Sequence, residues 1–330
     1  MFIRKSKSCP LITFMVLIFL GICCGATGAQ TKTVRLSIAT GGTGGVYYVM
    51  GGGIAAIISK HMPNTEATAE VTAAAVDNLK LIMTQKADVA FSTADVAYDG
   101  FRGAERFKST GKIPIQALAM IYPSVSHIVS IEGTGIAKAA DLKGKRVSTG
   151  APGSGVEVTA LKILDALQID PNKDIRRERL GFTESVGAVK DRKLDAFFAG
   201  PGIPAAAIMD LASSPGIKIK LIHHDDLLEK INQKFGPTYF RFVIPKETYT
   251  GMTEPAPVIA TGNLLVVHEK MDERIAYGIV KVIFDRRNDL IAVHKEAEKI
   301  TLANAVTGSG IPFHPGAIKY YKEQKAWPEK

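Results

Sequence analysis

Two glycine-rich segments carry the plainest chemical signal in the sequence. They are residues 40–45 (TGGTGG) and 149–155 (TGAPGSG), and each stands between a strand-like run and a helical pattern. A turn from a strand into a helix leaves the first N–H groups of the helix without partners, and glycine lets a ligand approach them. With the helix dipole, such amides bind an anion. Thr43 and Ser154 add hydroxyl donors, and Tyr47 directly follows the first loop, so we expect an anion site at each segment.

Neither loop is a nucleotide-binding motif or a catalytic elbow. Tyr47 stands where G-x-G-x-x-G needs its third glycine, and the second loop lacks the Lys-Ser/Thr ending of a phosphate loop. Ala151 and Pro152 precede the GSG of the second loop, so it is not G-x-S-x-G, and no histidine is placed to activate Ser154. The plainer alternative is that the glycines only make tight turns. We expect binding without a cofactor, and an enzyme acting on a small anionic substrate, such as a hydrolase, is the alternative.

The order of elements around the two loops is the same. In both copies a strand leads into the loop and a helix, followed by a second strand, a second helix and a third strand. The predicted strands are 34–40, 66–72 and 86–92 in the first copy, and 146–149, 175–180 and 193–199 in the second. The second helices are expected to begin near Asp77 and Asn78, and at Thr183, with Thr183 as N-cap. The sequence therefore predicts two α/β lobes of similar construction.

Alternation of strands and helices predicts parallel sheets covered by helices. Ligands of such sheets bind outside the carboxyl ends of the strands. Both glycine loops are expected at those ends, as are residues 92–95 and 200–204. Two lobes whose binding edges face each other enclose a cleft, which suits a small ligand.

The N-terminus has the order of an export signal. Three cations precede an apolar run at 11–24, and small residues follow it up to Ala29. The run is shorter than the roughly 20 residues that span a bilayer. We therefore predict a signal peptide at 1–29 and a periplasmic protein; a lipid anchor at Cys23 or Cys24 is the alternative.

Cleavage after Ala29 would change both charge and thiol content. It removes three cations and no acid, so the formal net charge falls from +9 to +6, and it removes Cys9, Cys23 and Cys24, the three cysteines of the chain. The mature protein would have no disulfide, cysteine metal site or thiol nucleophile. Its positive charge includes no dense basic run, which disfavours nucleic acid as a partner.

A length of 330 residues favours two domains. The predicted bounds are 30–123 plus 258–330 for the first lobe and 124–257 for the second. The chain would cross between them at 122–124 and 258–262, and helices at 272–287 and after Pro315 would pack on the first lobe. Two crossings allow hinge closure, and a solute that touches both lobes favours the closed form. We expect a monomer.

Three motifs place these elements in a family context: residues 40–48 (TGGTGGVYY), 141–155 (DLKGKRV with GAPGSG) and 311–321 (IPFHPGAIKYY). They resemble the TAXI family of solute receptors, which serve TRAP-type tripartite transporters. The likeness runs in order over the whole chain after residue 29. It implies a type II periplasmic-binding-protein fold, a ligand such as glutamate, glutamine or a related small organic acid, and a TRAP-type membrane permease as partner.

The resemblance implies ligand contacts on both loops, on Tyr47, around Asn78 and at 92–95. The candidate ligand-binding residues are Thr40, Gly42, Thr43, Gly44, Gly45, Tyr47, Asp77, Asn78, Ser92, Asp95, Ala151, Pro152, Gly153, Ser154, Phe198 and Gly200. Asp77 departs from the family pattern, in which a Gly-Ser pair often precedes the asparagine. This acid either shifts the ligand preference or caps the helix.

Two further groups leave alternatives open. Residues 223–226 (HHDD) are either part of a metal site or a solvated turn in which Asp225 or Asp226 caps the next helix. Arg241 either reaches a ligand carboxylate or forms an ordinary ion pair. Core packing is the default for Tyr122 and Tyr239.

Overall fold

The computed structural model describes residues 1–2 and 33–328. The predicted cleavage site and all three cysteines lie outside the described residues, as does nearly all of the predicted signal peptide. The chain divides between Thr33 and Val34, and every element below belongs to the part that begins at Val34. Among the described helices, none has the length and apolar character needed to cross a membrane.

A six-stranded sheet forms the base of the first lobe. Its strands are β1 (Val34–Ala39), β2 (Thr65–Glu70), β3 (Val89–Thr93), β4 (Ile115–Val125), β10 (Tyr239–Ile244) and β11 (Ala256–His268). Through β10 and the first half of β11, the sheet continues along the second lobe. The order is β10-β11-β3-β1-β2, and β4 pairs with β11. Strand β1 is parallel to β2 and β3, whereas β11 is antiparallel to β3, β4 and β10.

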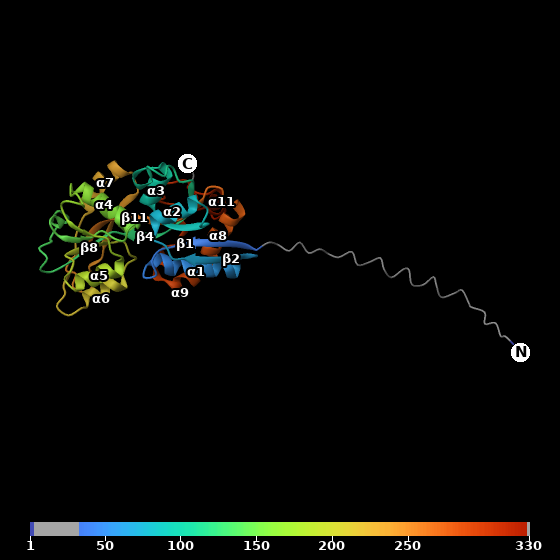
Figure 1. Ribbon diagram of the computed structural model, residues 1–330, viewed down its shortest axis with the longest axis horizontal. Helices are drawn as coiled ribbons and strands as arrows, with labels where there is room; N and C mark the ends of the chain where they lie inside the picture. The colour runs from blue at the N-terminus through green and yellow to red at the C-terminus, as the bar shows by residue number, and fades with distance from the viewer. Residues whose placement is uncertain (3–32, 329–330) are drawn as a thin grey trace. The chain divides into compact units, whose positions relative to one another are not determined.

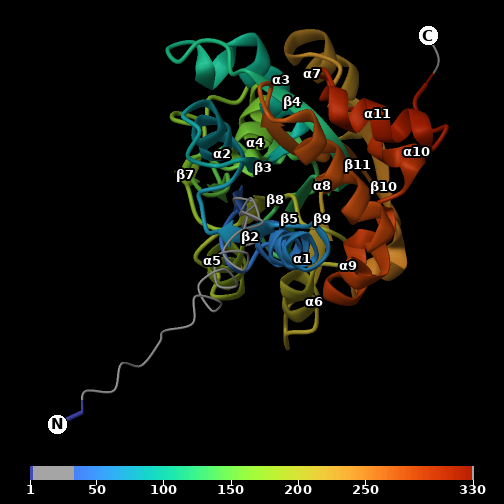
Figure 2. The same ribbon diagram turned by 90° about the vertical axis from the view of Figure 1, so that its right-hand side faces the viewer.

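Helices from both ends of the described chain cover this sheet. They are α1 (Val46–His61), α2 (Ala75–Met83), α3 (Ala94–Arg102), α8 (Glu273–Asp285), α9 (Arg287–Val293), α10 (Leu302–Ala305) and α11 (Pro315–Glu323), with the 3-10 turns η1 (Glu105–Phe107) and η5 (Lys295–Lys299). One apolar core joins residues of β1 to β4 with residues of β11, α8 and α11. Blue and red segments therefore share a lobe in Figure 1, and α1 lies beside α9 in Figure 2.

The second lobe is built on a five-stranded sheet of order β7-β6-β8-β5-β9. Its elements are β5 (His127–Ile131), η2 (Ala139–Leu142), β6 (Arg146–Ser148), α4 (Gly155–Ala166), β7 (Arg176–Glu178), α5 (Phe182–Lys190), β8 (Ala196–Ala199), α6 (Ala206–Ala212), β9 (Ile219–Leu221), η3 (Asp225–Leu227), α7 (Leu228–Phe235) and η4 (Lys246–Thr248). Two apolar clusters form its core, and β10 and the first half of β11 contribute to them.

The repeat predicted from the sequence is confirmed. The segment β1-α1-β2-α2-β3 has its counterpart in β6-α4-β7-α5-β8, and in each lobe the first strand lies between the other two and parallel to them. In each sheet an antiparallel strand lies on the other side of the third strand: β11 pairs with β3 in the first lobe, and β5 pairs with β8 in the second. Both glycine loops consequently lie at the carboxyl ends of β1 and β6.

Two predicted helix starts are wrong. Helix α2 begins at Ala75, and its N-cap is Ala74 at φ 76°, so Asp77 lies in the first turn and does not cap. Helix α5 begins after Gly181, so Thr183 is not its N-cap. Gly181 is the N-cap of this helix, and no side chain caps it. Strand β2 also ends at residue 70, two residues before the predicted end.

The two segments expected to cross between the lobes lie side by side. Strands β4 and β11 pair along this stretch, with Tyr122 opposite Asn263 and Ser124 opposite Thr261. The predicted helix at 272–287 is α8, where Asp272 accepts N–H groups at the N-cap, and the closing helix α11 begins at Pro315. Both helices pack in the first core, which confirms their predicted place.

Two buried histidines make the second lobe sensitive to acid. His127 and His224 are fully buried, and desolvation lowers the pKa of each to about 4. The neutral ring of His127 hydrogen-bonds Val125 O through Nδ1 and accepts from the hydroxyl of Tyr249 through Nε2, at 2.8 and 3.1 Å. A second proton on this ring would place a charge in a fully buried site and would require the hydrogen bond with Tyr249 to reverse its direction.

We predict that the free energy of unfolding is intact above pH 6.5, the ordinary histidine pKa, and falls as the pH drops from there towards 4. At pH 4.5 each histidine accounts for a loss of about 2 to 3 kcal/mol, because the unfolded chain binds the proton that the folded chain excludes. Urea titrations at pH 7 and 4.5 measure this. His224→Leu should lose less stability between the two pH values than the wild type, and His223→Leu, at a partly exposed neighbour, should lose as much. Equal losses in all three proteins would contradict the prediction.

Candidate functional site

The first glycine loop is open to an anion. Gly42, Thr43 and Gly44 are exposed, and helix α1 starts after Gly45 with no side chain capping it. The first N–H groups of α1, including that of Tyr47, therefore have no capping acceptor from a side chain. A Cβ at Gly42 would meet no atom within 4 Å, so the space beside this glycine is open.

Asn78 holds the loop in place from behind. It is fully buried, and its Nδ2 donates to Thr40 O at 2.7 Å and to Phe91 O at 2.8 Å, while its Oδ1 accepts from Thr72 Oγ1 at 2.6 Å. The hydroxyl of Thr40 donates to Glu70 O at 2.6 Å. The side chains of Asn78 and Thr40 donate their hydrogen bonds to main-chain oxygens of the first lobe. We therefore assign both residues to positioning the loop, whereas the sequence predicted that they contact the ligand directly.

Tyr47 points into the first lobe. Its hydroxyl donates to Asn263 Oδ1 at 2.5 Å, and its ring stacks on Phe91 with 4.8 Å between centroids. Burial raises the pKa of Tyr47, and the charge of Asp95 raises it further, so the phenol stays neutral. Asn263 was not predicted; it lies on β11 opposite Thr93 of β3.

The second glycine loop differs from the first because it already binds a carboxylate of the chain. Ser154 caps α4: its Oγ accepts the N–H of Glu157 at 3.2 Å and donates to Ala151 O at 2.7 Å. The carboxylate of Glu157 accepts the N–H of Gly153 at 3.1 Å. The expected donors Gly153 and Ser154 are thus taken by the protein itself. Pro152, next to them, is exposed.

Three arginines surround the same carboxylate. Glu157 Oε1 lies 2.7 Å from Arg177 and 2.6 Å from Arg179, and Oε2 lies 3.0 Å from Arg106. The side chain of Glu157 is fully buried, whereas those of Arg106 and Arg179 are 34% and 45% exposed. Arg106 belongs to η1 of the first lobe and the others to the second, so this cluster joins the lobes and carries an excess of two positive charges.

Backbone contacts also join the lobes at this side of the cleft. Val76 N, at the start of α2, donates to Gly153 O at 3.0 Å. The carboxylate of Asp77 would lie 3.1 Å from a Cβ at Gly153, and Thr183 Oγ1 would lie 3.1 Å from a Cβ at Gly44. The structure is therefore a closed form, in which Asp77 and both loops lie at the lobe–lobe contact.

A second buried charge cluster joins α3 to α4. Lys162 Nζ lies 2.8 Å from Asp99 and 3.4 Å from Asp95, and the hydroxyl of Tyr239 donates to Asp95 Oδ2 at 2.5 Å. The three charged side chains are at most 5% exposed. Asp95, expected to touch the ligand, is here paired with a lysine of the other lobe, and Ser92 is buried with its hydroxyl directed to Thr93 O at 3.3 Å.

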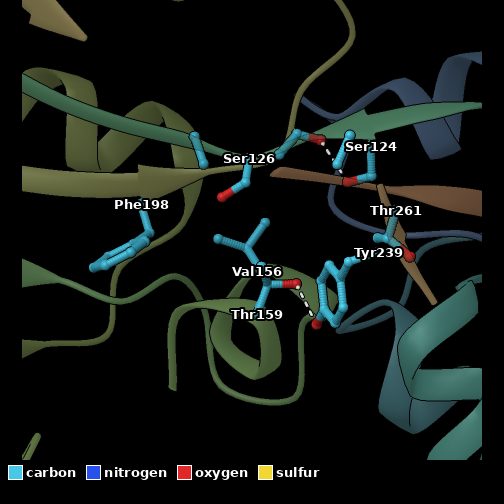
Figure 3. A pocket seen from close by; sticks show the side chains of 10 residues that line it. Ser124, Ser126, Val156, Thr159, Phe198, Tyr239 and Thr261 are labelled. Carbon is cyan, nitrogen blue, oxygen red and sulfur yellow. Dashed lines mark hydrogen bonds between the residues drawn. The ribbon is translucent and has the colours of Figure 1, made fainter. Parts of the chain in front are cut away.

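A small pocket remains at the hinge between the lobes (Figure 3). It is lined by Ser124, Ser126, Val156, Thr159, Phe198, Ala199, Gly200, Tyr239, Ala260 and Thr261. Its volume of about 10 Å³ for the centre of a water-sized molecule holds roughly one water. The predicted residues Phe198 and Gly200 lie here, although the ring of Phe198 packs into the core of the second lobe. An organic solute requires the lobes to separate somewhat.

Several buried polar atoms near the lobe–lobe contact have no hydrogen-bond partner among residues 33–328. They include Thr93 Oγ1, Asp95 Oδ1, Thr238 Oγ1 and Asn263 Nδ2. Leaving such an atom unpaired costs about 1–3 kcal/mol. Thr93 and Asn263 are neighbours in register, and Gly155 of α4 packs against Thr93. A ligand or water between the lobes would supply the missing partners.

Sequence reasoning missed the hydroxyl groups of the pocket. Ser124 and Thr261 lie on the crossing strands, Ser126 lies between β4 and β5, and Thr159 lies one turn into α4. The alternation of small hydroxyl residues next to the predicted crossing at 122–124 was the available signal. Their convergence depends on the pairing of β4 with β11, which sequence alone does not show.

The remaining candidates lie apart from the cleft. Arg241 forms an ion pair with Asp225 at 2.7 Å, which decides between its two alternatives. Neither Asp225 nor Asp226 caps a helix, because both lie inside η3, whose N-cap is His224, and helix α7 begins after Leu227. The solvated-turn interpretation of 223–226 is wrong for His224, which is buried. Across the described part of the chain, no group of three or more His, Cys, Asp or Glu side chains could hold a metal ion.

Solved structures show a likeness in fold. A protein from Bordetella bronchiseptica RB50 superposes with a TM-score of 0.51 at 16% identity, over 90% of each chain. The alkanesulfonate-binding protein SsuA from Xanthomonas axonopodis pv. citri, bound to MOPS, has a TM-score of 0.48 at 15% identity, over 90% of this chain and 81% of that one. A putative L-cystine ABC transporter from Listeria monocytogenes has 0.49 at 13%, over 81% and 95%.

The expected fold, two α/β lobes of the periplasmic-binding-protein type, is confirmed by the matching strand order of the two sheets and by the likeness over both lobes. At the sequence level, the profile of the NMT1-like family matches residues 38–324, which include both glycine loops, both crossings and the closing helix α11. Because this match covers most of the chain, the chain belongs to the NMT1-like family.

Proposed function

We propose that this protein is an extracytoplasmic solute-binding protein without catalytic activity. It captures a small organic acid, such as glutamate or a dicarboxylate, between its lobes. The observation that carries the proposal is the uncapped start of α1, which faces the opposite lobe across the exposed loop 42–44. The solute's anionic group binds these amides, and its other end reaches the hydroxyl-lined pocket at the hinge.

The lobes bounded by 30–123 plus 258–330 and by 124–257 move about the paired strands β4 and β11. Closure brings the two sets of contacts together. The solute therefore binds the closed form more tightly than the open form, and this difference in affinity sets how far it shifts the protein towards closure. The closed protein then delivers the solute to a TRAP-type membrane permease. The motifs at 40–48, 141–155 and 311–321 support this choice of permease.

A binding experiment tests this function. Native mass spectrometry of freshly purified residues 30–330 should show a co-purified small acid, and calorimetric titration with L-glutamate and succinate should detect binding by at least one of them. Gly42→Val should weaken that binding about tenfold or more, because its side chain would occupy open space beside the loop that we propose the solute enters. His223→Ala, away from the cleft, should bind as the wild type does. Conversion of an anionic ester by a protein that binds neither acid would contradict the proposal.

A further inference from the structure

The charge cluster around Lys162 exists only when the lobes are together. Asp95 and Asp99 lie on α3, which packs in the core of the first lobe, whereas Lys162 lies on α4 of the second. Lys162 Nζ is 2.8 Å from Asp99 Oδ2 and 3.4 Å from Asp95 Oδ2. Separation of α3 from α4 would return all three groups to water.

Closure leaves this cluster with an excess of negative charge. Two carboxylates share one ammonium group, and all three side chains are at most 5% exposed. A buried charge without a counterion is costly, and a protein commonly avoids the cost by changing its protonation. One proton on the carboxylate pair would bring the cluster to neutrality.

We propose that the protein takes up a proton at the carboxylates packed around Lys162 when its lobes close. The ratio of closed to open protein therefore rises as the pH falls. This regulation rests on the proposed function only in that both require the lobes to open and close.

The groups that face Asp99 agree with this assignment. Burial raises the pKa of Asp99 to about 6; Lys162 opposes the rise, and the charges of Asp95 and Glu105 add to it. Tyr239, from β10, directs its hydroxyl to Asp95 Oδ2 and leaves Asp99 without that hydrogen bond. Asp99 is therefore the carboxylate that takes up the proton in the closed form as the pH falls to about 6 and below.

A second carboxylate between the lobes acts in the same direction. Glu296 of η5 accepts the N–H of Ile203, in the loop after β8, at 2.9 Å. Burial raises the pKa of Glu296, although this hydrogen bond and the charges of Lys299 and Lys295 oppose the rise; Glu298 adds to it. Burial is the larger of these effects, so the net pKa of Glu296 is raised in the closed form.

The sign and size of the effect follow from linkage. A carboxyl with a pKa of about 6 in the closed form and the ordinary 3.8 in the open form binds a proton on closing between these values. Between pH 8 and pH 5 the ratio of closed to open protein then rises about tenfold from Asp99 alone. Closure should weaken as the pH rises through 6.

Energy transfer between dyes on the two lobes measures the ratio without any solute. Residues 30–330 contain no cysteine, so Lys86→Cys and Lys193→Cys, on exposed residues of the first and second lobe, provide the labelling sites. We expect transfer to rise as the pH falls from 8 to 5. Asp99→Asn, which mimics the protonated carboxyl, should be more closed at pH 8 and lose most of the dependence. Asp210→Asn, at an exposed carboxylate paired with Lys190, should keep it.

If the protein is closed at every pH, energy transfer will not change, and the titration must be observed directly. Carbon NMR of protein labelled at the aspartate carboxyl groups measures it. The Asp99 carboxyl, identified by its loss in Asp99→Asn, should titrate near pH 6. An ordinary titration near 4, or a pH dependence that Asp99→Asn retains in full, would overturn the proposal. Binding of L-glutamate at a fixed pH is a separate readout, and its absence would count against the proposed function alone.

Discussion

Glu157→Gln should lower the free energy of unfolding by about 3 kcal/mol, since removing one partner of a buried ion pair leaves the others without compensation. The carboxylate is fully buried and contacts Arg106, Arg177 and Arg179, so the amide would leave three guanidinium groups facing one another. Burial already lowers the pKa of Arg177; Glu157 counters this, and the charges of the other two arginines add to it. Urea unfolding at pH 7 measures the loss.

A matched control is available in the other copy of the repeat. Glu184 is also the third residue of its helix, but it is exposed. Glu184→Gln should change the stability by less than about 0.5 kcal/mol. Arg106→Gln removes only the partner from the first lobe, so it should affect closure more than the stability of the second lobe. Similar stabilities for Glu157→Gln and Glu184→Gln would show that the arginine cluster does not depend on its carboxylate.

Gly155→Val should prevent the lobes from closing and weaken binding of the solute about 10- to 100-fold. A Cβ at Gly155 would lie 2.8 Å from both Oγ1 and Cγ2 of Thr93, which is 5% exposed at the end of β3. The contact joins the two lobes, so opening relieves it without unfolding either one. Forcing atoms into a packed site costs about 1–3 kcal/mol, which corresponds to this range of affinity.

Calorimetric titration and energy transfer between the labelled lobes measure the two effects of Gly155→Val. Gly187→Val is the control, because a Cβ at Gly187 on α5 meets no atom within 4 Å. The control should close and bind as the wild type does, and both variants should keep the helical circular dichroism of the wild type. Unchanged closure in Gly155→Val would mean that α4 does not approach β3 this closely in solution.

The two glycine loops, similar in sequence, have different surroundings. The first remains uncapped, whereas Gly153 and Ser154 of the second are used by Glu157. Ser154 and Glu157 form an S-x-x-E sequence, which favours a helix cap of this kind. The sequence predicted an anion site at each loop. We instead propose that the amides after the first loop bind the anionic group of the solute and that the hydroxyl groups at the hinge contact its other end.

The sequence by itself determined the features that depend on neighbours along the chain. Glycine spacing, strand alternation and apolar periodicity were enough to predict two copies of one α/β unit, the loops at 40–45 and 149–155, and helices α8 and α11. These are local properties, because turns and helix starts depend on a few consecutive residues. The errors at Asp77 and Thr183 concern single residues at helix starts.

Only the tertiary structure decided which side chains remain available to a solute. Asn78 and Asp95 have the chemistry of ligand contacts, yet one is used by backbone carbonyls and the other by a lysine 67 residues away. The pocket at the hinge likewise joins Ser124 to Thr261 through the pairing of β4 with β11. Such contacts depend on how the two lobes close on each other, and no pattern along the chain contains that information.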